Sequence, residues 1–177
     1  TVDGGKATIE ALESGAIDFV TKPANIFDVS GEQKKAEIIK KIRIAYGFSK
    51  KKQASPKKTG HVADGPEQRQ RSSELKALIA IGSSTGGPKA LQEVIPYIPE
   101  DIPAAVLIVQ HMPPGFTKSL AERLDALSGM TVKEGDDNEV ICPGHVYIAP
   151  GDYHMEVVKD QDGRMRIRLT RDDPEKG

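Results

Sequence analysis

The sequence predicts an α/β protein built on a parallel sheet, and the evidence for this is a repeated order of elements. Two short apolar runs, 75–81 and 104–109, have the length and composition of buried strands. Each run is followed by a glycine-containing loop and then by an amphipathic helical pattern. Strand, loop and helix repeated in this order build a right-handed parallel sheet.

The composition is that of a globular protein. The chain has 177 residues, of which 37% are hydrophobic, and its formal charge of -1 gives no overall electrostatic reason to bind nucleic acid. The longest apolar run, 104–109, is far shorter than the roughly 20 residues that cross a bilayer. A single cysteine, Cys142, fits a reducing compartment. We expect a cytoplasmic monomer without membrane insertion and, because the first residue is Thr1, a piece of a longer protein.

The N-terminal part, residues 1–48, is predicted to be the closing half of an α/β unit. Apolar residues in 7–12 fit one face of a short helix, and Gly15 is placed to cap it. Residues 17–21 are expected to form a strand that ends at Lys22. A second amphipathic pattern over 36–46 predicts another helix.

Residues 49–73 have the composition of a linker. They contain few large apolar residues and many Lys, Gln, Ser, Pro and Gly. A basic stretch can also bind nucleic acid or an acidic membrane, but this one has no Phe, Tyr or Trp on which bases could stack. We therefore expect a solvated linker between two domains.

Residues 74–177 carry the parallel sheet. Helices are expected from Gly86-Gly87-Pro88 to about Ile95, and from Phe116 to Leu127. Beyond them, shorter strands separated by Gly and Asp turns are expected around residues 132, 140, 145–149, 155–158 and 165–169.

The turn after the first strand, 82–88, is one candidate for chemistry. Ligands bind at the carboxyl ends of parallel strands, and a serine on a glycine-flanked turn there is open to a substrate. Ser84 lies two residues after Gly82 and two before Gly86, which makes it the best-placed nucleophile. From the loop alone, a phosphate or nucleotide site or a plain structural turn remain alternatives, although the P-loop and G-x-G-x-x-G patterns do not fit.

A histidine follows the second strand. His111 has the position of a general base, because an imidazole accepts a proton at neutral pH. Neighbouring parallel strands would place it on the same sheet edge as Ser84. A single histidine is more often a surface residue, and we expect that of His61 in the linker and of His154, which with Asp152 reads as part of a surface hairpin. His145 is expected to open a strand, and the sequence predicts no metal site.

Three motifs together resemble one family. The segments Leu78–Pro88, Gln110–Thr117 and Pro143–Asp152 closely resemble the CheB family of bacterial chemotaxis protein-glutamate methylesterases. The segment Ala11–Pro23 resembles the end of a response-regulator receiver domain, which is flavodoxin-like, as found in the same family. The resemblance implies three parts: the end of a receiver (1–48), a linker (49–73), and the first part of a doubly wound methylesterase domain (74–177).

The resemblance also implies roles for individual residues. Ser84 matches the nucleophile, His111 the histidine that activates it, and Thr85, with Gly86 and Gly87, the active-site turn. Lys22 matches the receiver lysine that contacts the phosphoryl group, and Phe19 the aromatic switch position. From the residues alone, Lys22, which precedes a proline, is interpreted as the solvated end of the predicted strand.

The resemblance implies hydrolysis of glutamate γ-methyl esters on chemoreceptors by a Ser-His-Asp mechanism, and leaves open the deamidation of receptor glutamines. The implied partners are the chemoreceptors and the chemotaxis histidine kinase. Hydrolysis needs no cofactor, whereas phosphorylation of an intact receiver needs Mg²⁺. The triad acid and the phospho-accepting aspartate do not match any residue here, so these 177 residues alone are expected to be feebly active at best. The rival hypothesis is a non-enzymatic, phosphorylation-regulated adaptor that docks on receptors.

Overall fold

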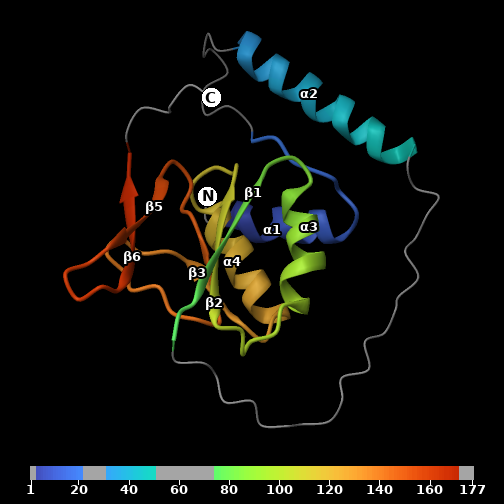
Figure 1. Cartoon of the computed structure of the whole chain (residues 1–177). Coiled ribbons are helices and arrows are strands. Elements are labelled where there is room, and N and C mark those ends of the chain that lie inside the picture. The colour runs from blue at the N-terminus through green and yellow to red at the C-terminus, as the bar shows by residue number, and fades with distance from the viewer. Residues whose placement is uncertain (1–2, 22–30, 51–73, 172–177) are drawn as a thin grey trace, which may run out of the picture.

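The computed structural model describes residues 3–21, 31–50 and 74–171, as helices, strands and the turns between them (Figure 1). None of the described helices is long and apolar enough to cross a membrane. In chain order the elements are α1 (Asp3–Glu13), α2 (Gly31–Lys50), β1 (Ala77–Ser83), α3 (Gly87–Val94), the 3-10 turn Ile95–Tyr97, β2 (Ala104–Gln110), α4 (Phe116–Leu127), β3 (Thr131–Glu134), β4 (His145–Ile148), β5 (His154–Lys159) and β6 (Met165–Thr170).

The sheet is parallel, as the sequence predicts, and its four strands lie in the order β1-β2-β4-β3. Strands β1 and β2 are paired along their whole length, from Ala77 opposite Ala104 to Ser83 opposite Gln110. Strand β2 pairs with β4, with Val106 opposite Val146. The carboxyl ends of β1 and β2 therefore lie side by side.

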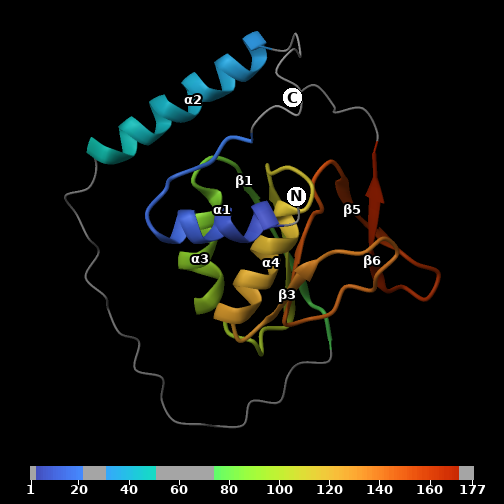
Figure 2. The same cartoon turned by 180° about the vertical axis from the view of Figure 1, so that it is seen from behind.

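The two faces of the sheet are covered differently (Figures 1 and 2). Helices α3 and α4 pack on one face, where Val106, Ile108 and Val146 meet Leu91 and Leu120. The antiparallel hairpin β5–β6 covers the other face, where Tyr147 and Leu107 contact Ile167. The described residues thus show helices on one face of the sheet only, whereas the predicted doubly wound arrangement would place helices on both.

Strand β1 differs from the prediction that it is buried. It forms an edge of the described sheet, and Leu78 and Ile79 are 37% and 40% exposed, because β2 is its partner on one side only. Strand β2 is central, and every residue from Ala104 to Ile108 is buried. An apolar run therefore predicted both strands correctly but not their unequal burial.

The N-terminal residues form two helices and an irregular segment. Helix α1 ends before Gly15, whose φ of 111° is left-handed as the predicted cap requires. The strand predicted over 17–21 is wrong: residues 16–21 have no regular structure, because no described strand lies beside them to supply hydrogen bonds. Helix α2 is longer than the predicted 36–46.

Helix α1 shares its core with the sheet-covering helices. Ile9 and Leu12 are almost fully buried in the cluster that contains residues of α3 and α4. The division into domains at 48 and 74 stays a prediction, and most of the predicted linker, 51–73, lies outside the described residues.

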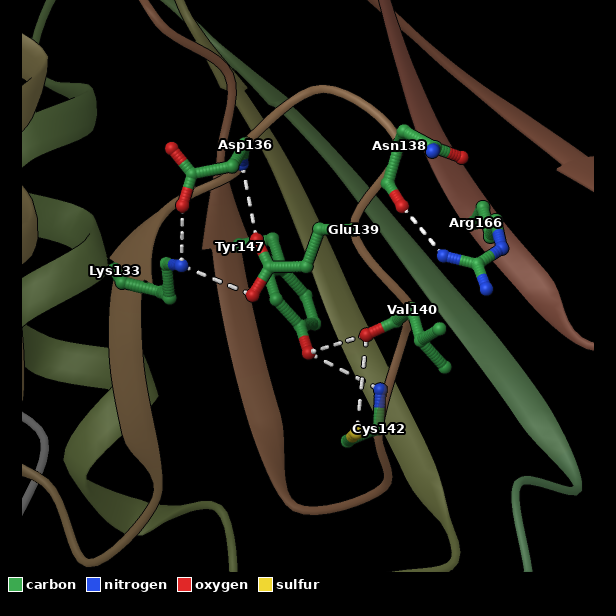
Figure 3. A network of polar contacts seen from close by, with 8 residues as sticks. All are labelled: Lys133, Asp136, Asn138, Glu139, Val140, Cys142, Tyr147 and Arg166. Atoms are coloured by element: carbon green, nitrogen blue, oxygen red, sulfur yellow. Dashed lines mark hydrogen bonds and ion pairs between the residues drawn. The ribbon is translucent and has the colours of Figure 1, made fainter.

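A polar network fastens the loop between β3 and β4 to the sheet (Figure 3). Lys133 Nζ lies 2.6 Å from a carboxylate oxygen of Asp136 and 2.9 Å from one of Glu139. The Cys142 N–H donates to the Tyr147 hydroxyl oxygen (3.1 Å), and burial raises the pKa of the Tyr147 hydroxyl to about 12. The tyrosine is therefore neutral at physiological pH and acts as a structural hydrogen-bonding group.

Candidate active site at the ends of two strands

The first turn joins β1 to α3 and carries Ser84. Gly86 adopts a left-handed conformation (φ 78°) immediately before α3, and the N–H of Gly87 donates to the Ser84 carbonyl (2.8 Å). Pro88 lies in the first turn of the helix, where its missing N–H removes no helical hydrogen bond. Ser84 itself is exposed, so its hydroxyl is open to a substrate.

The second turn joins β2 to α4 and carries His111. The His111 N–H donates to the Ser83 carbonyl (3.0 Å), which extends the pairing of the two strands into their turns. His111 is exposed, and Gly115 (φ 84°) makes the left-handed bend before α4. The sheet therefore places Ser84 and His111, as predicted, on one edge.

Ser84 and His111 line the same cavity, of about 250 Å³. Within the described residues, no hydrogen bond joins the Ser84 hydroxyl to the imidazole. Catalytic hydrogen bonds are often formed only once a substrate is bound. Asp152, predicted to belong to a surface hairpin, lies instead at the turn before β5 with φ 66° and lines this cavity too.

Gln110 is a residue of the site that the sequence analysis missed. It ends β2 and is 5% exposed. Its Oε1 accepts a hydrogen bond from the Ser83 hydroxyl (2.7 Å), and its Nε2 donates to the Ser84 carbonyl (3.0 Å). The one polar residue at the end of an otherwise apolar strand was the signal that could have identified it.

Ser84 also lines a second, larger cavity of about 630 Å³ on the same turn. It is lined by Thr85, Gly86 and Gly87, and by Gly15 and Ile17 of the N-terminal part. Lys22 lies outside the described residues.

The N-terminal part forms one wall of the cavity that contains Ser84 and His111. The Phe19 ring stacks on Phe116, the first residue of α4, with centroids 5.0 Å apart. Lys41 of α2 holds this segment, since its Nζ donates to the Phe19 carbonyl (2.7 Å) and lies 3.2 Å from an Asp18 carboxylate oxygen. Asp18, Phe19 and Thr21 therefore line the cavity that contains Ser84 and His111.

Helix α2 adds charged groups to the same wall. Glu37 bonds Lys34 (2.8 Å) and Lys41 (3.3 Å). The hydrogen bond from Lys34 is the main reason why the pKa of Glu37 is below its usual value. This carboxylate is therefore ionised at neutral pH, and the positive charges of the two lysines lie beside its negative charge.

The second turn is held from the side of β4. Thr117, fully buried in the first turn of α4, donates to Glu134 Oε1 (2.5 Å) and accepts from the Gly151 N–H (3.1 Å). Gly151 lies against backbone atoms of the His111 loop, so that a Cβ there would come within 2.5 Å of the Pro114 nitrogen. The turn at 150–152 and the His111 loop are thus in close contact.

His145 and His154 do not line this cavity, and His61 lies outside the described residues. His145 opens β4 as predicted, and its Nδ1 lies 3.0 Å from the Pro143 carbonyl. His154 begins β5 in the predicted hairpin. No three His, Cys, Asp or Glu side chains of the described ranges cluster as a metal site requires, and the Mg²⁺ expected for an intact receiver stays a prediction.

Comparison with known proteins places this geometry in a family. The family model described as CheB methylesterase matches residues 79–176. Relatives named protein-glutamate methylesterase/protein-glutamine glutaminase include those of Thermotoga maritima (42% identical; 98% of this chain, 48% of the relative) and Archaeoglobus fulgidus (43% identical; 98% and 49%). The chain thus spans about half the length of these curated relatives.

A solved structure agrees with the sequence comparisons. The crystal structure of the Thermotoga maritima CheB methylesterase catalytic domain is 51% identical and superposes with a TM-score of 0.53, covering 59% of this chain and 53% of that one. Because the family model matches more than half of its residues, the chain belongs to the CheB methylesterase family.

Proposed function

We propose that the complete protein containing this chain is a carboxylic ester hydrolase that removes methyl groups from glutamate γ-methyl esters, with Ser84 as nucleophile and His111 as general base. The observation that carries this proposal is the pairing of Ser83 with Gln110, which brings the next residues, Ser84 and His111, to one cavity. The names of the relatives support the substrate class.

The reaction follows from the two side chains. Ser84 Oγ attacks the ester carbonyl while His111 takes the hydroxyl proton, and the carbonyl π electrons move onto the oxygen. Backbone N–H groups at the start of α3 stabilise that oxyanion. The intermediate collapses, the carbon–oxygen bond to methoxide breaks, and His111 returns the proton to give methanol. Water, activated by His111, then hydrolyses the acyl-enzyme and regenerates Ser84.

The acid that orients His111 is proposed to come from outside the described residues. Asp152 lines the cavity with an exposed side chain, but no residue of this chain matches the triad acid that the family resemblance implies. In a comparable triad the loss of the orienting acid lowers kcat by about 10⁴. We therefore expect these 177 residues alone to hydrolyse the ester only feebly.

The substrates are proposed to be methylated chemoreceptors, and the same site would act on receptor glutamines if water hydrolysed an acyl-enzyme formed with loss of ammonia. The alternative is an adaptor that docks on receptors without chemistry. It shares the exposed turn at Ser84 but requires no reactive hydroxyl.

Labelling with a fluorophosphonate distinguishes the hydrolase from the adaptor. In the complete protein we expect covalent modification at Ser84, and Ser84→Ala should abolish both labelling and methanol release, a loss of roughly 10⁶ in kcat. Ser119→Ala, a serine on α4, is the matched control and should label normally. Unlabelled wild-type protein, or full labelling of Ser84→Ala, would contradict the proposal.

We also infer that residues 1–48 end a receiver domain whose phosphorylation, by the chemotaxis histidine kinase, uncovers the cavity. In the structure Phe19 and Asp18 line the cavity beside Ser84, and the Phe19–Phe116 stack holds them there. Lys22 would contact the phosphoryl group and Phe19 would act as the switch aromatic.

Removing this wall of the cavity should raise basal activity. We expect Phe19→Ala in the complete protein, or deletion of residues 1–48, to increase the unphosphorylated esterase rate at least fivefold, the lower end of typical coupling between sites. Ile42→Ala, which truncates an exposed residue of α2 outside the cavity, is the control. An unchanged or lower rate in both the Phe19 variant and the deletion would contradict the inference.

A further inference from the structure

We propose that Gln110 is a positioning residue whose buried side-chain amide fixes the Ser84 turn against His111; this rests on the proposed function of Ser84. Gln110 is the last residue of β2, immediately before His111. It pairs with Ser83, the residue before Ser84. A single side chain therefore reaches from the strand of the proposed base to the turn of the proposed nucleophile.

The amide is bonded on both sides. Its Oε1 accepts from the Ser83 hydroxyl (2.7 Å), while its Nε2 donates to the carbonyls of Ser84 (3.0 Å) and His111 (3.4 Å). Reversing the amide would direct Oε1 at two carbonyl oxygens, which offer no proton, so this orientation alone satisfies the groups present. The hydrogen bonds of the Gln110 amide therefore stabilise this arrangement of the turn.

The Ser84 carbonyl is fixed from two directions. It accepts hydrogen bonds from Gln110 Nε2 and from the Gly87 N–H (2.8 Å). Because a carbonyl oxygen has two lone pairs, these two donors determine the direction of the peptide that follows Ser84. Fixing that peptide restricts ψ of Ser84 and so holds its Cα–Cβ bond in one direction relative to α3.

Gly87 gives Gln110 the space it occupies. A Cβ built on Gly87 would overlap Gln110 Oε1 and come within 2.9 Å of both its Cδ and the Ser83 Cβ. Gly87 has no left-handed φ that would demand glycine, so the close approach of the amide and of Ser83 is the physical reason for a glycine there. The Gln110 amide can therefore occupy this position only because residue 87 is a glycine.

Buried polar side chains are costly unless they are bonded, and this one is bonded only to backbone and side-chain groups of the two turns. An apolar residue would have ended β2 with less desolvation. The amide's contacts all lie within one residue of Ser84 or His111, which points to the geometry of this pair as its role.

The test uses the complete protein and measures the second-order rate constant of fluorophosphonate labelling together with kcat and KM for ester hydrolysis. Gln110→Ala and Gly87→Ala should each slow labelling and lower kcat between about 10- and 100-fold, because a misplacement of about 1 Å at a reacting group costs up to 10² in rate. KM should stay within about twofold for Gln110→Ala, since Gln110 lines neither cavity.

The double variant tests whether Gly87 and Gln110 act together or independently. Independent effects would multiply to between about 10² and 10⁴. We expect the Gly87→Ala/Gln110→Ala variant to lose clearly less than this product, because the added methyl no longer meets an amide, although it still comes within 2.9 Å of the Ser83 Cβ. Multiplicative losses would overturn the claim that Gly87 acts through Gln110.

A merely structural role makes different predictions. Gln92→Ala is the matched control, because it truncates another glutamine of this part of the chain whose buried Nε2 has no hydrogen-bond partner; it should leave the labelling rate unchanged. Gln110→Met, which keeps side-chain volume, replaces Gln110→Ala if the latter fails to fold. Wild-type labelling of a folded Gln110 variant, with only its melting temperature lowered, would overturn the inference.

The proposed function fails separately. If Ser84→Ala abolishes labelling while Gln110 and Gly87 variants react like wild type, the hydrolase proposal stands and the positioning role is wrong. If Ser84→Ala still labels fully, Ser84 is not the nucleophile and both proposals fall.

Discussion

Helices α3 and α4 both begin after a glycine in the left-handed conformation, Gly86 (φ 78°) and Gly115 (φ 84°), and neither has a side-chain cap. The turns before them differ in what holds them. The Ser84 turn is held by the amide of Gln110, which reaches in from the neighbouring strand. The His111 loop is held by packing against Gly151 and by the buried Thr117.

Because of this difference, a substitution is expected to affect the position of a site residue in one turn and the folding free energy in the other. Gly82, at the start of the Ser84 turn, has open space where a Cβ would lie, whereas Gly151 is in close contact with the backbone of 112–114. A methyl group added at Gly82 should therefore cost little folding free energy, whereas one added at Gly87, in the same turn, would meet Gln110 and Ser83. Changes around the second must first disrupt packed backbone.

The largest expected effect on stability comes from Gly151→Ala. The added Cβ would lie 2.5 Å from the Pro114 nitrogen and 2.7 Å from the Pro113 carbonyl carbon, so backbone must shift. Overpacking of this kind costs about 1–3 kcal/mol, and stretching the bond from the Gly151 N–H to Thr117 adds about 1 kcal/mol. Urea unfolding of the complete protein should show a loss of about 3 kcal/mol in the domain containing the sheet.

Gly82→Ala is the matched control for that measurement. It adds the same methyl group in extended backbone where nothing lies within 4 Å, so its free energy of unfolding should stay within about 0.5 kcal/mol of wild type. Equal losses in the two variants would show that the turns do not differ as described.

Much of this comparison could be predicted from the sequence. Apolar runs gave β1 and β2, and the glycine-containing loops after them placed Ser84 and His111 at one edge of a parallel sheet, as the strand pairing confirms. These are local signals, because strand length, turn glycines and helix periodicity are encoded within a few residues of each other.

The errors arose where pairing between distant segments decides the outcome. Residues 17–21 have strand-like composition but no described strand beside them, and β1 is apolar but lies at an edge. The bond from Thr117 to Gly151 spans 34 residues, and the contact of Gln110 with Ser83 spans 27. Residue spacing does not predict contacts between segments so far apart. The groups that hold the two turns were therefore identified only from the structure.

Thr117→Val provides the smaller and more specific test of the second turn. Valine keeps the shape of the fully buried side chain but loses the hydrogen bonds to Glu134 (2.5 Å) and from the Gly151 N–H (3.1 Å). Because the Gly151 N–H is then left without its partner, we expect a loss of about 2 kcal/mol in the free energy of unfolding. Thr131→Val makes the same change at an exposed position of β3 and should alter stability by less than about 0.5 kcal/mol. If Thr117→Val is as stable as Thr131→Val, packing of Gly151 against the His111 loop holds this turn by itself, and the hydroxyl contributes nothing measurable.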